Sequence, residues 1–304
     1  MGLNIMAHLR RAAGLGQRGE GALRAGARGA GARPKAGQPA PVERRASNHA
    51  APRRLSTGFS TGFCTGLYAR LSQGLSTDCP LCGLAARAGR FCPGCAADLR
   101  AHYSASARCP RCARPLAGPP GWCGVCIRRP PAFACVVAAV DYAPPADAGV
   151  RRYKDGRLAE GRALAALMAQ AWREAGLAEA GALLTSVPAS RRGLRQRGFC
   201  PPAELARRLA RELGLPFAPW ALRRLREVPR QHGQGARGRR RALRGVFAAD
   251  PAQCAGRPVI LVDDVLTTGA TAQACALALR RAGAGPVTVL VAARTPARSA
   301  ALAQ

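Results

Sequence analysis

Short apolar runs alternate with longer amphipathic stretches over the second half of the chain. Four runs rich in Val, Leu, Ile and Ala are typical of strands covered on both faces of a parallel sheet, and they span 134–142, 182–187, 259–262 and 286–293. Stretches with apolar residues at helical spacing lie at 158–175, 204–213 and 272–283. Strands that alternate with helices predict an α/β fold with a mostly parallel sheet.

The segment 259–271 reads VILVDDVLTTGAT and combines a strand pattern with polar residues. Its first four residues predict a buried strand, so Asp263 and Asp264 are expected at the carboxyl end of that strand. Ligands bind at this edge in open α/β sheets. N–H groups and hydroxyls in a turn before a helix form a cradle for phosphate. The turn predicted here consists of Thr267, Thr268, Gly269, Ala270 and Thr271.

Three interpretations of 259–271 compete. A core strand with a polar turn needs no ligand, but it leaves two carboxylates and three threonines in one tight segment. A Walker B strand of an ATPase needs a P-loop with a Gly-Lys-Ser/Thr step. Neither lysine of the chain, Lys35 after Pro34 or Lys154 after Tyr153, provides that step. The third interpretation is a ribose-5-phosphate site.

The segment 259–271 closely resembles the phosphoribosyl-pyrophosphate signature of type I phosphoribosyltransferases. Residues 191–206, RRGLRQRGFCPPAELA, and residues 231–247 resemble segments of the ComF family of phosphoribosyltransferase-like proteins, which is linked to bacterial DNA uptake. Together with a cysteine-rich front, the likeness covers about 78–294. Two residues depart from the family pattern, since Cys200 and Ala242 stand where Asn is common.

The resemblance implies binding of phosphoribosyl pyrophosphate with Mg²⁺. Asp263 and Asp264 would bind the ribose hydroxyls and help to position the metal, and the turn 267–271 would hold the 5′-phosphate. Guanidinium forks and backbone N–H groups match pyrophosphate oxygens. The candidate pyrophosphate-binding residues are Ala189, Ser190, Arg191, Arg195, Arg197 and Lys154. The residues do not indicate an acceptor.

Eight of the thirteen cysteines form four CxxC pairs. They are Cys79, Cys82, Cys92, Cys95, Cys109, Cys112, Cys123 and Cys126. Two such pairs supply the four thiolates of a tetrahedral zinc site, so the spacing predicts a zinc-ribbon module with two structural Zn²⁺ sites. The spacing leaves open which pairs combine. Redox catalysis is the alternative, although no thioredoxin-like βαβ pattern surrounds any pair.

The other cysteines are most simply buried thiols, and they are Cys64, Cys135, Cys200, Cys254 and Cys275. Free thiols together with zinc indicate a reducing compartment, so a cytoplasmic location is expected. No run of eighteen apolar residues occurs, so no transmembrane segment is expected.

The formal net charge of +31 is carried almost entirely by arginine. Such a field attracts polyanions, but a composition bias toward Ala, Arg and Gly explains it equally well. Residues 1–76 contain twelve Lys or Arg against Glu20 and Glu43 and show no apolar periodicity, which predicts a disordered basic tail. A transit peptide, a start that lies downstream, or a nucleic-acid-binding tail would have the same composition.

The predicted organisation is a tail at 1–76, the zinc-ribbon module at 77–130 and a phosphoribosyltransferase-like α/β domain at 131–304. Two classes of function remain open. The first is a phosphoribosyltransferase that acts on an unidentified nucleophile, in DNA uptake or in nucleotide metabolism. The second is a non-catalytic module that binds single-stranded DNA through the zinc ribbons and the basic surface, with other DNA-uptake proteins as partners.

Overall fold

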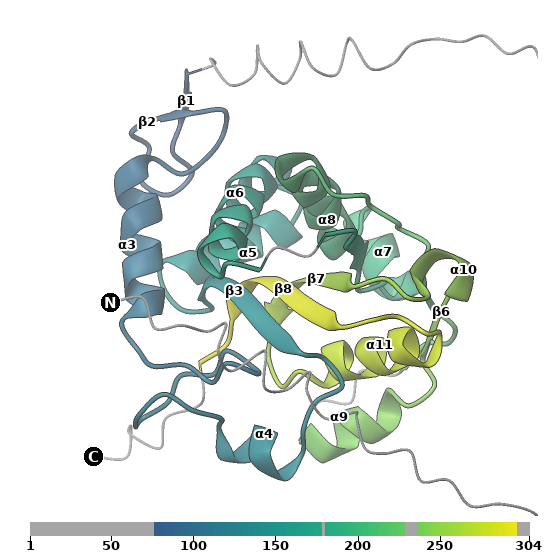
Figure 1. Ribbon diagram of the computed structural model, residues 1–304. Helices are drawn as coiled ribbons and strands as arrows, with labels where there is room; N and C mark the ends of the chain where they lie inside the picture. The colour runs from purple at the N-terminus through teal and green to yellow at the C-terminus, as the bar shows by residue number, and fades with distance from the viewer. Residues whose placement is uncertain (1–75, 178–179, 229–235, 297–304) are drawn as a thin grey trace, which may run out of the picture. The chain divides into compact units, whose positions relative to one another are not determined.

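The computed structural model describes residues 76–177, 180–228 and 236–296. Within these ranges, four parallel strands form a central sheet in the order β3-β8-β7-β4. Figure 1 shows β3, β8 and β7 side by side. Their bounds are β3 Cys135–Asp141, β8 Val287–Arg294, β7 Val259–Leu266 and β4 Leu183–Ser186. The apolar runs of the sequence thus form the sheet, and the middle strands β7 and β8 carry its best-buried residues.

Helices cover both faces of this sheet because successive side chains of a strand point to opposite faces. Ile260 and Val262 belong to a cluster that includes residues of α5 (Ala146–Lys154), α6 (Leu158–Glu174) and α8 (Pro201–Leu213). Val259 and Leu261 belong to a second cluster, which includes residues of α11 (Ala270–Arg281). The α/β fold with a mostly parallel sheet is therefore confirmed.

Strand β7 is longer than the sequence pattern predicts. The apolar run ends at Val262, but the strand continues through Asp263 and Asp264 to Leu266. The reason is non-local, since β8 pairs with β7 as far as Arg294, whereas β4 ends opposite Val262. The two aspartates thus lie beside β8 and beyond the end of β4.

The cysteine-rich front packs against the same sheet. It contains the hairpin β1 (Ser76–Asp78) and β2 (Ala85–Arg87), followed by α3 (Pro93–Ser104) and α4 (Gly124–Arg128). Leu99 of α3 joins the core cluster on the α6 face of the sheet. Arg100 donates to the carbonyl of Ala139 in β3 and forms an ion pair with Glu174 of α6.

The expected disordered tail, which includes Cys64, lies outside the described residues, apart from Ser76, which belongs to β1. Shorter elements complete the described part of the chain, and they are α7 (Arg191–Arg197), β5 (Leu222–Arg224), α9 (Ala236–Ala242), β6 (Phe247–Ala249) and α10 (Pro251–Cys254). In the described ranges, no helix has the length and apolar character needed to cross a membrane.

Candidate phosphate site and metal centres

The acidic pair Asp263 and Asp264 lies in the second half of β7, at the carboxyl edge of the sheet. The backbone N–H of Asp264 donates to Oδ1 of Asp263 at 2.9 Å, and that of Val265 donates to Oδ1 of Asp264 at 2.6 Å. These bonds fix one oxygen of each carboxylate. The strand therefore presents two oriented acidic groups at the edge where a ligand of an α/β sheet binds.

Lys154 is the cation that the fold brings to the acidic pair. It lies at the end of α5, and its Nζ is 3.2 Å from Oδ1 of Asp264. Both side chains are largely buried, with exposed fractions of 25% and 15%. The sequence pattern suggested Lys154 as a pyrophosphate ligand, and its contact with Asp264 is a feature that the pattern could not show.

The two aspartates do not carry equal charge. Burial raises the pKa of Asp263 to about 8, and the neighbouring carboxylate of Asp264 acts in the same direction. The backbone N–H of Asp264 and the charge of Lys154 oppose this rise. At neutral pH Asp263 is therefore mostly protonated, and the charge of Lys154 balances that of Asp264.

The phosphate turn, residues 267–271, joins the acidic pair to α11. Thr267 and Thr268 are exposed, and Gly269 caps the helix with φ of +75°, a left-handed conformation that favours glycine. The helix begins at Ala270, two residues earlier than the pattern predicts, so Thr271 lies in its first turn. The N–H of Ala270 donates to Oγ1 of Thr268 at 3.4 Å. All five predicted phosphate-binding residues thus surround one helix N-terminus.

The segment after β4 that contains most of the predicted pyrophosphate-binding residues forms a short helix, α7. Ala189 and Ser190 follow β4, and Ser190 caps α7 by accepting the N–H of Gly193 at 3.0 Å. Arg191 begins α7, and Arg197 ends it. The arginines of this segment are therefore distributed around a helical turn.

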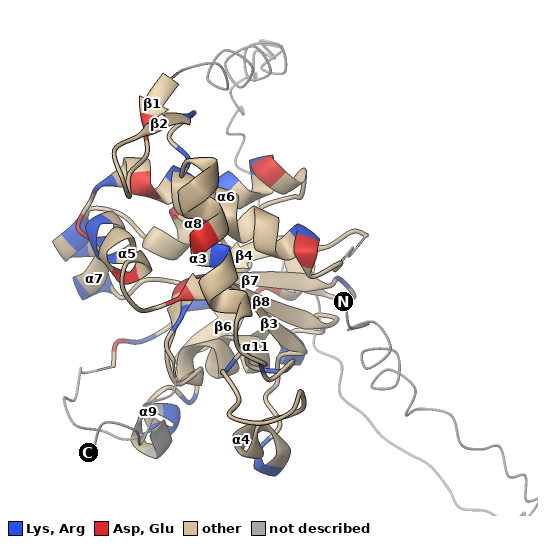
Figure 2. Cartoon of the chain, turned by 90° about the vertical axis from the view of Figure 1, so that its left-hand side faces the viewer, with Lys and Arg blue, Asp and Glu red and all other residues tan. Residues whose placement is uncertain are grey.

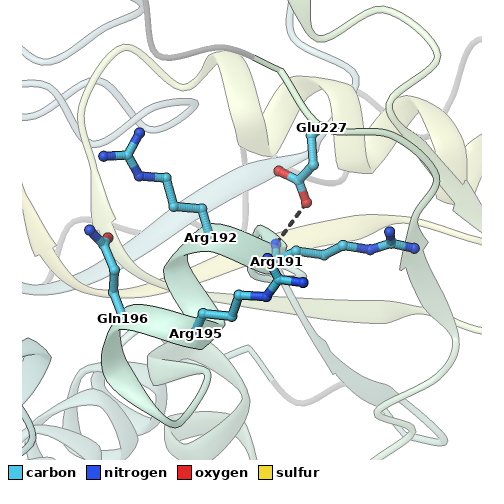
Figure 3. A pocket seen from close by; sticks show the side chains of 5 residues that line it. All are labelled: Arg191, Arg192, Arg195, Gln196 and Glu227. Atoms are coloured by element: carbon cyan, nitrogen blue, oxygen red, sulfur yellow. Dashed lines mark hydrogen bonds between the residues drawn. The ribbon is translucent and has the colours of Figure 1, made fainter.

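A hollow of about 550 Å³ lies beside α7 (Figure 3). Its lining residues are Arg191, Arg192, Arg195, Gln196 and Glu227. Oε1 of Glu227 accepts the backbone N–H of Arg191 at 2.7 Å, so this carboxylate anchors the start of the helix. Among the predicted arginines, Arg191 and Arg195 line the hollow, and Arg197 does not. No sequence signal pointed to Glu227, because its partner lies far away in the chain.

The eight CxxC cysteines form two separate clusters in the described part of the chain. Each cluster combines consecutive pairs, which answers the question that the spacing left open. The first cluster is Cys79, Cys82, Cys92 and Cys95, and the second is Cys109, Cys112, Cys123 and Cys126.

The geometry of both clusters fits zinc. The sulfur atoms of each cluster lie within 4.8 Å of one another. Sγ of Cys82 is 3.7 Å from Sγ of Cys92, and Sγ of Cys112 is 3.7 Å from Sγ of Cys123. Zn–S bonds of about 2.3 Å in a tetrahedron separate two sulfurs by about 3.8 Å. These residues could therefore hold a tetrahedral zinc ion in each cluster.

Backbone donors support the thiolate form that a metal requires. The N–H of Cys92 donates to Sγ of Cys79 at 3.4 Å, and the N–H of Cys123 donates to Sγ of Cys109 at 3.3 Å. A hydrogen bond from the Cys112 side chain, aided by the N–H of Cys123, lowers the pKa of Cys109 to about 4. The clusters are built alike and share no residue.

Two further residues, one near the acidic pair and one at the phosphate turn, were not recognised as site residues from the sequence. Cys200 is half-buried, and burial raises the pKa of its thiol, with the charges of Asp263 and Asp264 adding to the rise. Arg294, the last residue of β8, is 3% exposed and donates to carbonyls around the phosphate turn. An arginine directly after the apolar run 286–293 was the available signal.

A parallel sheet with an acidic pair and a threonine turn at its carboxyl edge, preceded by two four-cysteine clusters, defines a phosphoribosyltransferase-like protein with a zinc-ribbon-like front. No protein-family model matches the chain. The DNA utilization protein YhgH of Salmonella typhimurium is 36% identical over 211 residues, which cover 67% of this chain and 90% of that protein. The chain belongs to the ComF family, as the sequence resemblance predicted.

Other relatives agree with this assignment. YhgH of Escherichia coli is 34% identical over 207 residues, which cover 66% of this chain and 90% of that protein. Competence protein F of Haemophilus influenzae is 28% identical over 208 residues, which cover 66% of this chain and 88% of that protein.

Solved structures of two larger proteins match part of the domain. The first, titled as the allosteric regulatory enzyme of purine biosynthesis, is 25% identical, and the match covers 44% of this chain and 26% of that chain at a TM-score of 0.31. The second, a glutamine phosphoribosylpyrophosphate amidotransferase from B. subtilis, is 22% identical. That match covers 43% of this chain and 26% of the amidotransferase chain at a TM-score of 0.30. The relatives in sequence establish the family assignment.

Proposed function

We propose that the chain binds phosphoribosyl pyrophosphate together with Mg²⁺ and transfers the phosphoribosyl group to an acceptor that is not yet identified. One observation carries the proposal, namely that Asp263 and Asp264 on β7 lead directly into a threonine turn at the start of α11. Carboxylates that accept bonds from ribose hydroxyls, followed by donors for a 5′-phosphate, are the two groups that this ligand requires.

The remaining residues take roles that follow from their chemistry. The hydroxyls and N–H groups of 267–271 hold the 5′-phosphate. Ala189 and Ser190 offer backbone donors to the pyrophosphate, and Arg191, Arg195 and Arg197 supply guanidinium groups nearby. Bond breaking at C1′ leaves charge on the pyrophosphate, and fixed donors stabilise that charge. Positioning and electrostatics therefore carry the proposed reaction.

The acidic pair has a specific consequence for Mg²⁺. Carboxylate oxygens are ligands that Mg²⁺ prefers, and the ion would help to neutralise the pyrophosphate oxygens. However, Asp263 is mostly protonated at neutral pH, and Lys154 already balances Asp264. The free pair thus offers little net negative charge. We therefore expect the metal to bind together with phosphoribosyl pyrophosphate, whose oxygens attract Lys154 away from Asp264.

Titration calorimetry tests this proposal. Wild-type protein should bind phosphoribosyl pyrophosphate in the presence of Mg²⁺ and should show little heat with Mg²⁺ alone. The double variant Asp263→Asn/Asp264→Asn should lose binding, because amide oxygens carry no charge for Mg²⁺ and accept weaker hydrogen bonds from the ribose hydroxyls than carboxylates do. Asp147→Asn is the matched control, since it removes a carboxylate of α5 whose partner is Arg151. Undiminished binding by the folded double variant would overturn the assignment.

The names of the relatives support a cellular role. They are a DNA utilization protein and a competence protein, so we propose that this chain also acts in DNA uptake or DNA utilisation, alongside other proteins of that process. Four-cysteine clusters and free thiols suit a reducing compartment, so we place this role in the cytosol.

A second candidate function is binding of single-stranded DNA by the cysteine-rich front. Trp122 lies directly before Cys123 of the second cluster, and it is 45% exposed. The guanidinium of Arg111 lies 4.8 Å from the centre of the Trp122 ring. An exposed aromatic ring beside an arginine is the arrangement on which unpaired bases stack. Trp122 is therefore available for contact with a ligand.

A further inference from the structure

Arg294 makes an unusual set of contacts for a buried charged residue. Its side chain is enclosed at the end of β8, and the residue is only 3% exposed. Nη1 donates to the carbonyls of Leu266 at 2.9 Å, Thr267 at 2.8 Å and Thr295 at 2.7 Å. Nε donates to the carbonyl of Cys112 at 3.0 Å. One guanidinium thus binds four backbone carbonyls.

These carbonyls come from two parts of the molecule that the chain separates widely. Leu266 ends β7, and Thr267 opens the phosphate turn. Cys112 is a ligand residue of the second cluster. The N–H of Thr295 also donates to the Leu266 carbonyl at 3.0 Å, which strengthens the same junction. Arg294 therefore connects the backbone of a cluster ligand to the backbone of the phosphate turn.

The charge of Arg294 points to the same connection. A buried cation needs a compensating charge or a set of hydrogen bonds, and Arg294 has its four bonds to carbonyls. Four thiolates and one Zn²⁺ carry a formal net charge of −2. The second cluster with its ion bound would therefore place negative charge on the Cys112 side of this guanidinium. The planar guanidinium of an arginine has five N–H donors, so it can face the cluster and the phosphate turn at the same time.

A second contact connects the same two parts of the molecule. The backbone N–H of Ala132, which follows the second cluster, donates to Oε1 of Gln273 at 2.8 Å. Gln273 lies in the first turns of α11, just after the phosphate turn. The second cluster and its following segment therefore hold the turn from both sides, before it through Arg294 and after it through Gln273.

We propose that Arg294 is a positioning residue that ties the phosphate turn to the second four-cysteine cluster, so that metal occupancy of this cluster sets the order of the turn. The identity of the ligand in the turn rests on the proposed function, but the coupling itself does not. The first cluster serves as an internal comparison, because its contacts lead to α5 through Arg152 and the carbonyl of Pro80.

Amide hydrogen exchange of the phosphate turn, residues 267–271, in zinc-loaded protein tests the coupling without any ligand. Arg294→Lys keeps the charge but cannot span four carbonyls, so exchange in the turn should accelerate about tenfold to a hundredfold. Arg108→Lys is the matched control. Arg108 is another largely buried arginine of the cysteine-rich front. It donates to the carbonyls of Tyr103 and Ala113 and forms an ion pair with Asp141, and none of these partners belongs to the phosphate turn.

A second set of variants removes the metal ion from one cluster at a time. Cys112→Ser should remove the second ion and accelerate exchange in the turn by a similar factor, whereas Cys82→Ser should remove the first ion and leave the turn unchanged. Zinc content and exchange in β7 report whether each variant remains folded. Equal exchange in the turn for wild type, Arg294→Lys and Cys112→Ser would overturn the proposal.

Ligand binding is measured in parallel. If wild type binds phosphoribosyl pyrophosphate, Arg294→Lys should weaken the affinity by about tenfold, while Arg108→Lys should change it less than about twofold. If wild type fails to bind, the proposed function fails, and the exchange measurement still decides the role of Arg294.

Discussion

Asp263 shows how the site differs from an ordinary end of a strand. Burial and a second carboxylate keep its pKa near 8, far above the usual range of an aspartate. A side chain chosen for stability alone would not hold an acid in this position. A loss of stability at one position is common where a residue is kept for binding or catalysis.

The same shift predicts how stability depends on pH. A folded-state pKa of about 8, against about 3.9 in the unfolded chain, means that the native state binds more protons. The stability contributed by Asp263 is therefore complete below about pH 4 and is lost as the pH rises to about 8. Asp263→Asn does not titrate, so it should be more stable than wild type at pH 7 by up to about 4 kcal/mol.

Thermal unfolding of both proteins at several pH values from 5 to 8 measures this difference. The difference in stability between the variant and the wild type should grow with pH, because only the wild type releases a bound proton from residue 263 when it unfolds. Metal loss at acidic pH affects both proteins alike, so the comparison at each pH remains valid. Parallel curves over this range would contradict the assignment of the raised pKa to Asp263.

At the level of single residues, the sequence predicted the acidic pair and the turn because 259–271 is a local motif. It could not predict the contact of Lys154 with Asp264, since α5 reaches β7 only through the packing of the domain. Glu227 and Arg294 were missed for the same reason. Their partners, Arg191 and the carbonyls of Leu266 and Thr267, lie far from them in the chain.

At the level of elements, apolar runs predicted all four strands of the main sheet in the described ranges. The pattern failed for α7, because RRGLRQR has no apolar periodicity. That helix depends instead on the Ser190 cap and on Glu227. Strand β7 was predicted too short, since its polar second half is held by pairing with β8. A non-local pairing therefore accounts for the length of β7, and a local cap together with the distant Glu227 accounts for α7.

The pairing of the cysteines also belongs to this scale. Cys82 and Cys92 are separated by ten positions and Cys112 and Cys123 by eleven, so each cluster closes within one short segment. Spacing alone could not exclude pairs taken from different segments. The two clusters share no ligand, so each should bind and lose its ion independently.

Metal analysis of purified protein should therefore return about two zinc ions per chain. Cys82→Ser and Cys112→Ser should each retain about one ion, because the other cluster keeps all four thiolates. Cys64→Ser and Cys135→Ser should leave the metal content unchanged. Loss of both ions from either cluster variant would show that the clusters depend on each other.

At the level of the whole molecule, the positive charge is widely distributed. The chain carries a formal net charge of +31, and Figure 2 shows basic segments on α7 and α9, among others. A field of this kind brings a polyanion to the surface without choosing its position. Position must come from local features, and Trp122 with Arg111 is the feature that the front module offers.

Binding of a fluorescent single-stranded oligonucleotide tests this division of roles. Trp122→Ala should weaken binding by about tenfold, because stacking of a base on an aromatic ring contributes about 1–3 kcal/mol. Trp220→Ala is the control, since Trp220 is 72% exposed but lies outside the front module. Affinity should fall steeply with salt in all three proteins, because arginines still contact phosphates. Equal losses in the two variants would exclude Trp122 as a specific stacking position.

Three successive residues of α5 face three different parts of the molecule. Arg152 donates at 3.0 Å to the carbonyl of Pro80, the residue after the first cysteine of the first cluster. Tyr153 donates to the carbonyl of Pro201 in α8 at 2.8 Å, and Lys154 lies beside Asp264. These three contacts lie within a single turn of α5, so they depend on the position of one short helix. Any tilt that lengthens the contact with Pro80 must also move the ammonium group beside the acidic pair.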